Sequence, residues 1–170
     1  ITENCAEAAQ AGAIPIYWGD PDIGRYFNSK AFINCHDYPS LEAAVEAVIE
    51  AFLRPLELAQ ETGDAGWTHY LTLIAYINNS PYWGPRMMSE IFDELVNTFI
   101  AALRDALPGA EDKDLYWCYH NLSGALTLTL ARTGRIDRLS GGICSSDDFQ
   151  AAYDHMIPFV AAGFRQVCSH

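Results

Sequence analysis

The stretch over residues 85–134 constrains the fold most, because it predicts two long helices joined by one short break. In the first helix, apolar side chains recur at spacings of three and four, which keeps one helical face away from water. These residues are Met88, Ile91, Phe92, Leu95, Phe99, Ile100 and Leu103. Pro108 and Gly109 end this helix, and acidic residues begin the second, over residues 112–132. The second helix is apolar over so wide an arc that we expect it to be buried in a bundle or against a second copy.

Two further helices are predicted before this pair. Ser40 is a suitable N-cap for a helix over residues 41–56. Pro55 lies inside that pattern and should kink the helix or end it near Arg54. After a break that contains two glycines, a helix over residues 67–77 should run until an Asn-Asn-Ser-Pro sequence stops it.

One more helix is predicted after the pair. Ser146 and the two aspartates that follow it form a strong start signal for a helix over residues 149–167. Pro158 lies inside this helix and implies a bend. We expect residues 135–145 to form a polar, glycine-rich connection.

Residues 1–38 differ from the rest of the chain in their pattern. Residues 2–12 predict a helix of small residues, and residues 13–18 and 32–35 predict two short strands. A helix, a strand and a turn in that order are typical of a piece of an α/β sheet. The predicted organisation is therefore an α/β segment followed by a helical domain over residues 39–170.

Charge and composition limit the partners of this chain. Half of its 170 residues are hydrophobic, so it can bury a core of its own. Ten basic residues against twenty-two acidic ones give a formal net charge of -12. A surface that acidic repels phosphate backbones, so we expect no direct nucleic-acid binding by this chain alone.

The five cysteines are widely spaced and include no CxxC pair, which indicates reduced thiols in a cytoplasmic protein. Cys35 and His36 are adjacent, but no second ligand pair follows them, so we predict neither a metal nor a cofactor. No apolar run is long enough for a membrane span, and no signal peptide is recognisable. The chain begins with Ile1 rather than methionine, which suggests a fragment or a processed product.

Catalytic motifs find little support in this sequence. His69, His120 and His155 each lie in a predicted helix, and Asp154 is adjacent to His155, so their side chains point apart. No GxSxG, phosphate-binding glycine loop or HExxH motif is present. We therefore predict no catalytic residues.

A first resemblance covers roughly the first fifty residues. The segments PIYWGDP (residues 15–21) and FNSKAFIN (residues 27–34), preceded by Thr-Glu-Asn, resemble the donor-binding end of the α-1,3-fucosyltransferases of glycosyltransferase family 10. This implies that Glu3 contacts the nucleotide of GDP-fucose. Asn4 stands where that family has a lysine facing the phosphates, and a neutral amide lacks the lysine's charge. The family's acceptor-side domain and general base lie upstream of this segment. The enzymatic alternative is therefore a fucosyltransferase fragment that contributes to GDP-fucose binding.

A second resemblance covers roughly residues 39–168. The segments PSLEAAVEAVIEAFLRPLELA, FIAALRDALP and HNLSGALTLTLARTGRIDRLSGG resemble the C-terminal, effector-binding and dimerisation domain of TetR-family transcription regulators. The SDDF, AAYD and FVAAGF segments near the end agree with it. The resemblance implies a mainly α fold, a TetR C-terminal-like helical bundle, here preceded by the short α/β segment. In that family a helix-turn-helix DNA-binding head precedes the domain, and none is recognisable in this sequence. Two unlike resemblances in one chain suggest a chimera.

The second resemblance implies a homodimer and a hydrophobic small-molecule effector, so we predict a non-enzymatic ligand-binding and dimerisation domain. The predicted dimer interface lies on the last two long helices and comprises Ser123, Gly124, Phe159, Ala162 and Gly163. The predicted ligand-binding residues are mostly aromatic or apolar and comprise Trp67, Tyr70, Ile74, Met88, Phe92, Phe99, Trp117 and Asn121. The alternatives are that both helices are covered within the monomer and that the aromatic set is ordinary core.

Overall fold

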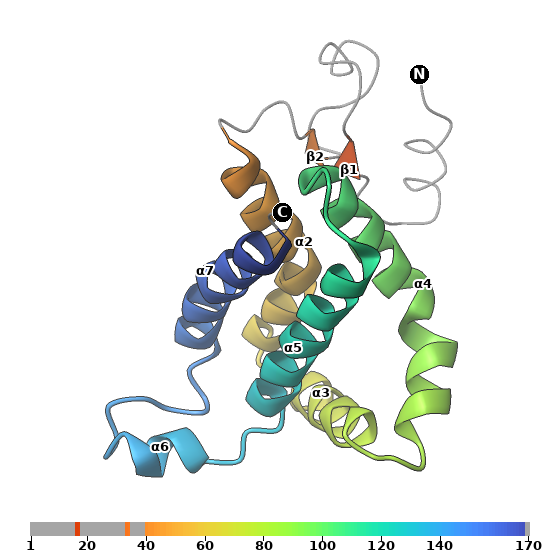
Figure 1. Ribbon diagram of the computed structural model, residues 1–170. Helices are drawn as coiled ribbons and strands as arrows, with labels where there is room; N and C mark the ends of the chain where they lie inside the picture. The colour runs from red at the N-terminus through yellow and green to blue at the C-terminus, as the bar shows by residue number, and fades with distance from the viewer. Residues whose placement is uncertain (1–15, 18–32, 35–39, 169–170) are drawn as a thin grey trace.

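The computed structural model describes residues 16–17, 33–34 and 40–168, and it is mainly helical (Figure 1). The helices are α2 (Leu41–Glu61), α3 (Ala65–Asn78), α4 (Gly84–Ala106), α5 (Asp112–Leu130), α6 (Arg135–Leu139) and α7 (Phe149–Cys168). The mainly α fold predicted from the sequence is therefore confirmed. Within the described part of the chain, none of the helices is both long and apolar enough to cross a membrane.

Two short strands precede the helices. β1 (Ile16–Tyr17) and β2 (Ile33–Asn34) pair in parallel, with Ile16 opposite Ile33. Both strands lie within the two segments for which the sequence predicts strands. The predicted helix over residues 2–12 lies outside the described residues, as does Glu3. The α/β segment as a whole stays a prediction.

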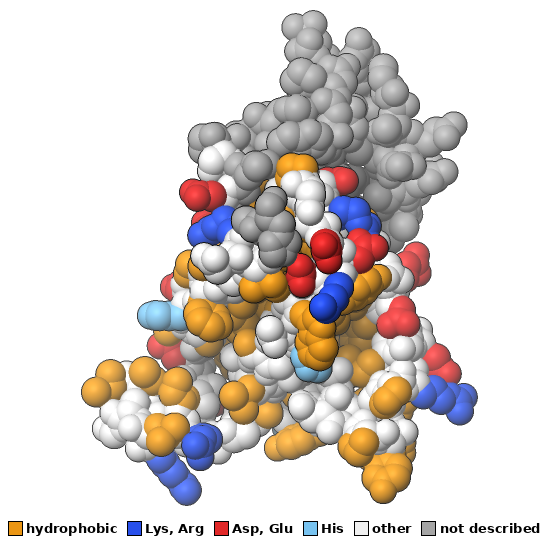
Figure 2. Space-filling model, in the orientation of Figure 1, with side chains coloured by type: hydrophobic (Ala, Val, Ile, Leu, Met, Phe, Trp, Pro, Cys, Tyr) orange, Lys and Arg blue, Asp and Glu red, His pale blue; other side chains and the backbone are white. Residues whose placement is uncertain are grey.

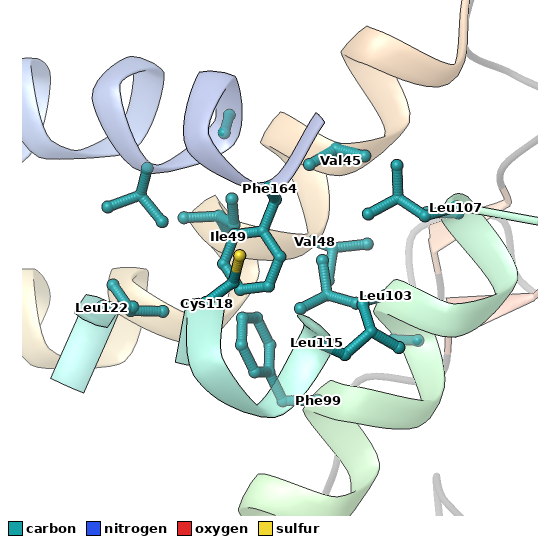
Figure 3. Close-up of a cluster of buried hydrophobic side chains, with 14 of the residues drawn as sticks. Val45, Val48, Ile49, Phe99, Leu103, Leu107, Leu115, Cys118, Leu122 and Phe164 are labelled. Atoms are coloured by element: carbon teal, nitrogen blue, oxygen red, sulfur yellow. The ribbon is translucent and has the colours of Figure 1, made fainter. Parts of the chain in front are cut away.

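The hydrophobic core lies where α2, α4, α5 and α7 meet. α2 packs against α7 and α4, and α5 packs against α7, α3 and α4. Figure 3 shows Phe164 of α7 among side chains from the other three helices, including Ile49, Phe99 and Cys118. These apolar side chains recur at helical spacing, so burying them together keeps one face of each helix dry.

α4 buries only the C-terminal half of its apolar face. Phe99, Ile100 and Leu103 are buried, whereas Ile91 and Leu95 are 54% and 49% exposed. The prediction of one continuous dry face is therefore wrong for Ile91 and Leu95. The reason is that α4 and α5 diverge toward the end of the bundle where α3 lies (Figure 1).

α2 continues through Pro55 to Glu61, so the alternative that it ends near Arg54 is wrong. A proline inside a helix removes one backbone hydrogen bond and crowds the preceding turn. Leu53 and Glu57 on either side are both buried, and packing of these two turns offsets that cost. The predicted cap is confirmed, since Ser40 Oγ accepts a hydrogen bond from the Ala43 N–H at 3.3 Å.

The connection between α5 and α7 differs from the prediction in two ways. It contains the short helix α6, which the glycine-rich sequence did not indicate. Asp148 rather than Ser146 caps α7, because Asp148 Oδ1 accepts a hydrogen bond from the Ala151 N–H at 3.0 Å. The Ser146 N–H donates instead to the Asp137 carboxylate at 3.0 Å. Hydrogen bonds from the Ser146 side chain and backbone lower the pKa of the Asp137 carboxyl.

Gly84, at the start of α4, approaches the end of α3 closely. A Cβ at this position would lie 2.9 Å from the Ile77 carbonyl oxygen and 3.1 Å from that of Asn78, both backbone atoms. We therefore expect Gly84→Ala to lower the free energy of unfolding by about 1–3 kcal/mol, measured by urea denaturation. Alanine is otherwise the better helix former by about 1 kcal/mol. An increase in stability would contradict the close approach of α3 and α4.

The three described cysteines differ in exposure. Cys118 of α5 and Cys168 of α7 are buried free thiols, whereas Cys144 is an exposed one. Burial is the main cause that raises the pKa of both buried thiols, that of Cys168 to about 12. Because the thiolate is the reactive form, we expect iodoacetamide at neutral pH to alkylate Cys144 in the folded protein. Cys118 and Cys168 should react only in urea, and peptide mass spectrometry checks this. Equal labelling of Cys168 and Cys144 in the folded protein would contradict the burial of Cys168.

Candidate functional site

Four helices, α2, α3, α4 and α5, surround a cavity of about 360 Å³. It adjoins the core, since Val48 and Phe99 belong to both, and it extends to α3. Its lining consists of Val48, Ala51, Phe52, Pro55 and Leu56 of α2, Tyr70, Leu71, Ile74 and Asn78 of α3, Met88, Phe92, Leu95, Val96, Thr98 and Phe99 of α4, and Tyr119, Ser123, Leu126, Thr127 and Leu130 of α5. Among these described lining residues, none carries a charge at neutral pH. The cavity therefore suits an apolar, uncharged molecule.

Helical spacing explains why these side chains share one cavity. On α3, Tyr70, Ile74 and Asn78 are four residues apart and therefore lie above one another on one face. On α5, Tyr119 and Ser123 have the same spacing. α3 is held against α5 by burial of Leu71 and Ala75 with Leu130 and by a hydrogen bond from Thr72 Oγ1 to the Leu130 carbonyl at 3.2 Å.

Polar side chains gather where the end of α3 meets the middle of α5. Asn78 Nδ2 donates a hydrogen bond to Ser123 Oγ at 3.0 Å. Tyr119 is half-buried beside them, and burial raises the pKa of its phenol. A side-chain hydrogen bond with Ser123 acts in the opposite direction, and the charge of Asp93 raises the pKa further. At neutral pH the phenol is therefore protonated and able to donate.

Phe99 links the cavity to the core beneath α7. Its ring stacks on Phe52 with centroids 4.3 Å apart, and it lies 6.3 Å from Tyr119. On its other side it meets Phe164 of α7 edge to face, with centroids 6.4 Å apart. One aromatic side chain thus contacts two walls of the cavity and the last long helix.

Five of the eight predicted ligand-binding residues line the cavity, namely Tyr70, Ile74, Met88, Phe92 and Phe99. Trp67 lies outside it, 46% exposed, with its ring edge to face with that of Tyr70 at 5.8 Å. Trp117 is 58% exposed and Asn121 is exposed, so both lie on the outer side of α5.

Several lining residues were not among the predicted ones. Phe52 and Leu56 belong to the apolar stripe of α2, and their periodicity alone does not separate a cavity wall from core. Asn78 and Ser123 are 45 positions apart and carry no shared motif. Only the packing of α3 on α5 brings this polar pair together.

The outer sides of α5 and α7 form a second feature, the α5–α7 face. It consists of Trp117, Asn121, Gly124 and Leu128 of α5 and Phe159, Ala162 and Gly163 of α7, all of them exposed. Phe159 is 75% exposed and Leu128 is 63% exposed. Figure 2 is drawn from the side on which α5 and α7 lie in front, and it shows exposed hydrophobic side chains there. The alternative that both helices are covered within the monomer is therefore wrong for the described chain.

Two glycines on the α5–α7 face are not required by packing within the monomer. A Cβ added to Gly124 or Gly163 would meet nothing within 4 Å. Ser123, predicted for the interface, is turned inward instead and lines the cavity. Of the five predicted interface residues, Gly124, Phe159, Ala162 and Gly163 lie on this face.

The described histidines include two whose rings contact their own helix. Nδ1 of His155 lies 2.7 Å from the Ala151 carbonyl oxygen, and the His120 ring packs edge to face on Trp117. Across the described residues, no three histidine, cysteine, aspartate or glutamate side chains are grouped so that they could hold a metal ion.

Comparison with known proteins gives one family match and one short, partial relative. The family model for the tetracyclin repressor-like, C-terminal domain matches residues 50–163. An α-(1,3)-fucosyltransferase FucT of Helicobacter pylori is 38% identical to this chain over 48 residues. That match covers 28% of this chain and only 10% of the length of the fucosyltransferase. No solved structure matches the chain.

Proposed function

This chain belongs to the tetracyclin repressor-like, C-terminal domain family, and from this premise we propose that it is the ligand-binding and homodimerisation domain of a TetR-like transcription regulator. The single observation that carries the proposal is the uncharged cavity of about 360 Å³ among α2, α3, α4 and α5. Protein interiors are close-packed, and an unfilled cavity forgoes the contacts its lining side chains would make. A hydrophobic effector would supply those contacts.

The proposed effector site comprises the predicted residues that line the cavity, with Phe52, Asn78, Tyr119 and Ser123 in addition. Its walls are mainly apolar, so burial of ligand surface would provide most of the affinity. The Trp67 ring packs edge to face against Tyr70, which lines the cavity, so Trp67 is proposed as a residue at the edge of the cavity.

Homodimerisation is proposed to use the α5–α7 face. Two helices from each copy would form a four-helix arrangement across a twofold axis. Trp117 and Phe159 offer large exposed aromatic side chains, the residue type that most often anchors interfaces. Gly124 and Gly163 allow the two backbones to approach closely, which supports the same assignment.

α5 is proposed to couple the two activities. Tyr119 and Ser123 of this helix line the cavity, while Trp117 and Gly124 lie on its exposed side. A ligand that shifts α5 would therefore also shift the dimer face, and the contact of Phe99 with Phe164 extends this coupling to α7. In an intact regulator, such a shift would alter the spacing of two DNA-binding heads.

A second candidate function concerns residues 1–38, which we propose as a segment separate from the helical domain over residues 39–170. The fucosyltransferase match favours it, and the proposed role is to contribute Glu3 to a GDP-fucose site. Isothermal titration with GDP-fucose tests this role. Binding that Glu3→Ala abolishes would support it, and no heat of binding at millimolar nucleotide sugar would contradict it.

Filling the cavity should weaken ligand binding. We expect Ile74→Trp to lower the affinity for ethylnaphthalene at least about tenfold, because the larger side chain takes up space in the cavity. An equilibrium titration followed by naphthalene fluorescence measures this. Leu73→Trp is the matched control, since Leu73 is the next residue on α3 and is 56% exposed. Equal binding by both variants would show that the probe binds elsewhere.

A further inference from the structure

We propose that the cavity binds an uncharged, mainly apolar molecule that carries a hydrogen-bond acceptor such as a ketone or ester carbonyl, and that Tyr119 donates the hydrogen bond that recognises it. This inference rests on the proposed function, because it takes the cavity to be the effector site. It adds the chemical class of the effector and names the residue that selects it.

The lining excludes charged ligands. A ligand carboxylate would be desolvated in a cavity that, among its described lining residues, has no arginine, lysine or histidine, and in a chain whose formal net charge is -12. A ligand cation would find no lining carboxylate to pair with it. Asp93, whose charge acts on Tyr119, is exposed and does not line the cavity. An uncharged molecule avoids both costs.

Two threonine hydroxyls in the lining are already used within their own helices. Thr127 Oγ1 donates to the Ser123 carbonyl at 2.9 Å, and Thr98 Oγ1 donates to the Glu94 carbonyl at 2.9 Å. A hydroxyl has one proton to donate, so neither threonine retains a donor for a ligand. The remaining polar lining side chains are Tyr70, Asn78, Tyr119 and Ser123.

At the polar end, the order of donors points to Tyr119 as the donor that faces the ligand. Asn78 Nδ2 donates to Ser123 Oγ at 3.0 Å, which leaves the serine O–H free to donate in turn. Tyr119 lies four residues before Ser123 on the same face of α5, and both side chains line the cavity. In the proposed series Ser123 donates to the phenol oxygen, and the proton of the phenol remains for the ligand. Donors in series polarise one another, so the last one is strengthened.

The α2 wall of the cavity offers no polar side chain. α2 contributes only Val48, Ala51, Phe52, Pro55 and Leu56. A ligand therefore fits in one orientation, with its hydrocarbon part against α2 and its acceptor toward α5. A polar group at the hydrocarbon end would be buried there without a partner, which costs affinity.

Four naphthalene derivatives of matched shape test the inference: acetylnaphthalene, ethylnaphthalene, naphthoate and naphthylmethylammonium. We expect acetylnaphthalene to bind most tightly and the two charged compounds to bind most weakly. Tyr119→Phe should weaken acetylnaphthalene binding about fivefold, the size of one neutral hydrogen bond, and leave ethylnaphthalene unchanged. Tyr116→Phe is the matched control, because Tyr116 lies on the same helix, is 48% exposed and does not line the cavity; it should change neither affinity.

The outcomes separate this inference from the proposed function. If ethylnaphthalene binds as tightly as acetylnaphthalene, or if Tyr119→Phe weakens both alike, the acceptor class is wrong while the cavity remains a ligand site. Tightest binding of either charged compound would likewise overturn the inference. If none of the four compounds binds at its solubility limit, the proposed ligand-binding function fails together with it.

Discussion

The substitution Phe159→Asp is expected to convert the proposed homodimer into a monomer. Phe159 is 75% exposed at the centre of the apolar part of α7, between Pro158 and Val160 in sequence. An interface with twofold symmetry carries every substituted residue twice, so two carboxylates would be buried on association. Loss of an aromatic anchor costs about 2 kcal/mol or more, and an unpaired buried charge adds to this. The dissociation constant should rise at least about a hundredfold.

Sedimentation equilibrium measures this change directly. Leu58→Asp is the matched control, since Leu58 is an exposed leucine of α2, 52% accessible, that is not part of the α5–α7 face. The control variant should remain dimeric with the affinity of the unmodified chain. A dimer that persists in Phe159→Asp would place the interface elsewhere, and a monomer in both variants would point to a general effect of added charge. A strictly monomeric unmodified chain would refute the dimer itself.

The helices were predictable because their apolar residues recur at helical spacing and their ends carry local signals. Ser40 is the clearest case, since its hydroxyl accepts from the Ala43 N–H as a cap should. The spacing reports which side of a helix is apolar, but it does not report what covers that side. Ile91 and Leu95 of α4 therefore matched the pattern of Phe99 and yet lie exposed. The separation of α4 from α5 is a property of the packed bundle.

The candidate site was predictable only in part, for a related reason. Of the residues predicted to bind a ligand, five from α3 and α4 line the cavity. On α5, neighbouring residues differ by about 100° around the helix axis. Asn121 and Ser123 therefore lie on different sides of α5. Asn121 was predicted for the ligand site but is exposed, and Ser123 was predicted for the dimer interface but lines the cavity. The hydrogen bond from Asn78 to Ser123 shows which side of α5 faces α3, and this hydrogen bond forms only when the two helices pack together.

The substitution Phe164→Ala should cause a large loss of stability. Phe164 is 1% exposed on α7 and packs edge to face against Phe99. Removing a buried phenylalanine side chain costs about 3–5 kcal/mol, because the lost transfer free energy is joined by the cost of the cavity left behind. Domains of this kind are stable by only about 5–15 kcal/mol. The midpoint of urea denaturation should therefore fall by a large fraction.

The stability change caused by Phe164→Ala has a different meaning in the unmodified chain and in a monomeric variant. The stability of a dimer depends on protein concentration, so dissociation and loss of core packing would both lower the midpoint in the unmodified chain. In a Phe159→Asp background, which is expected to be monomeric, only the loss of core packing lowers the midpoint. There Phe164→Leu should cost less than Phe164→Ala, since more of the side-chain volume is kept, and Leu58→Ala should change stability by about 0.5 kcal/mol or less. A loss of under about 1 kcal/mol for Phe164→Ala would mean that α7 is not packed through Phe164 onto α4.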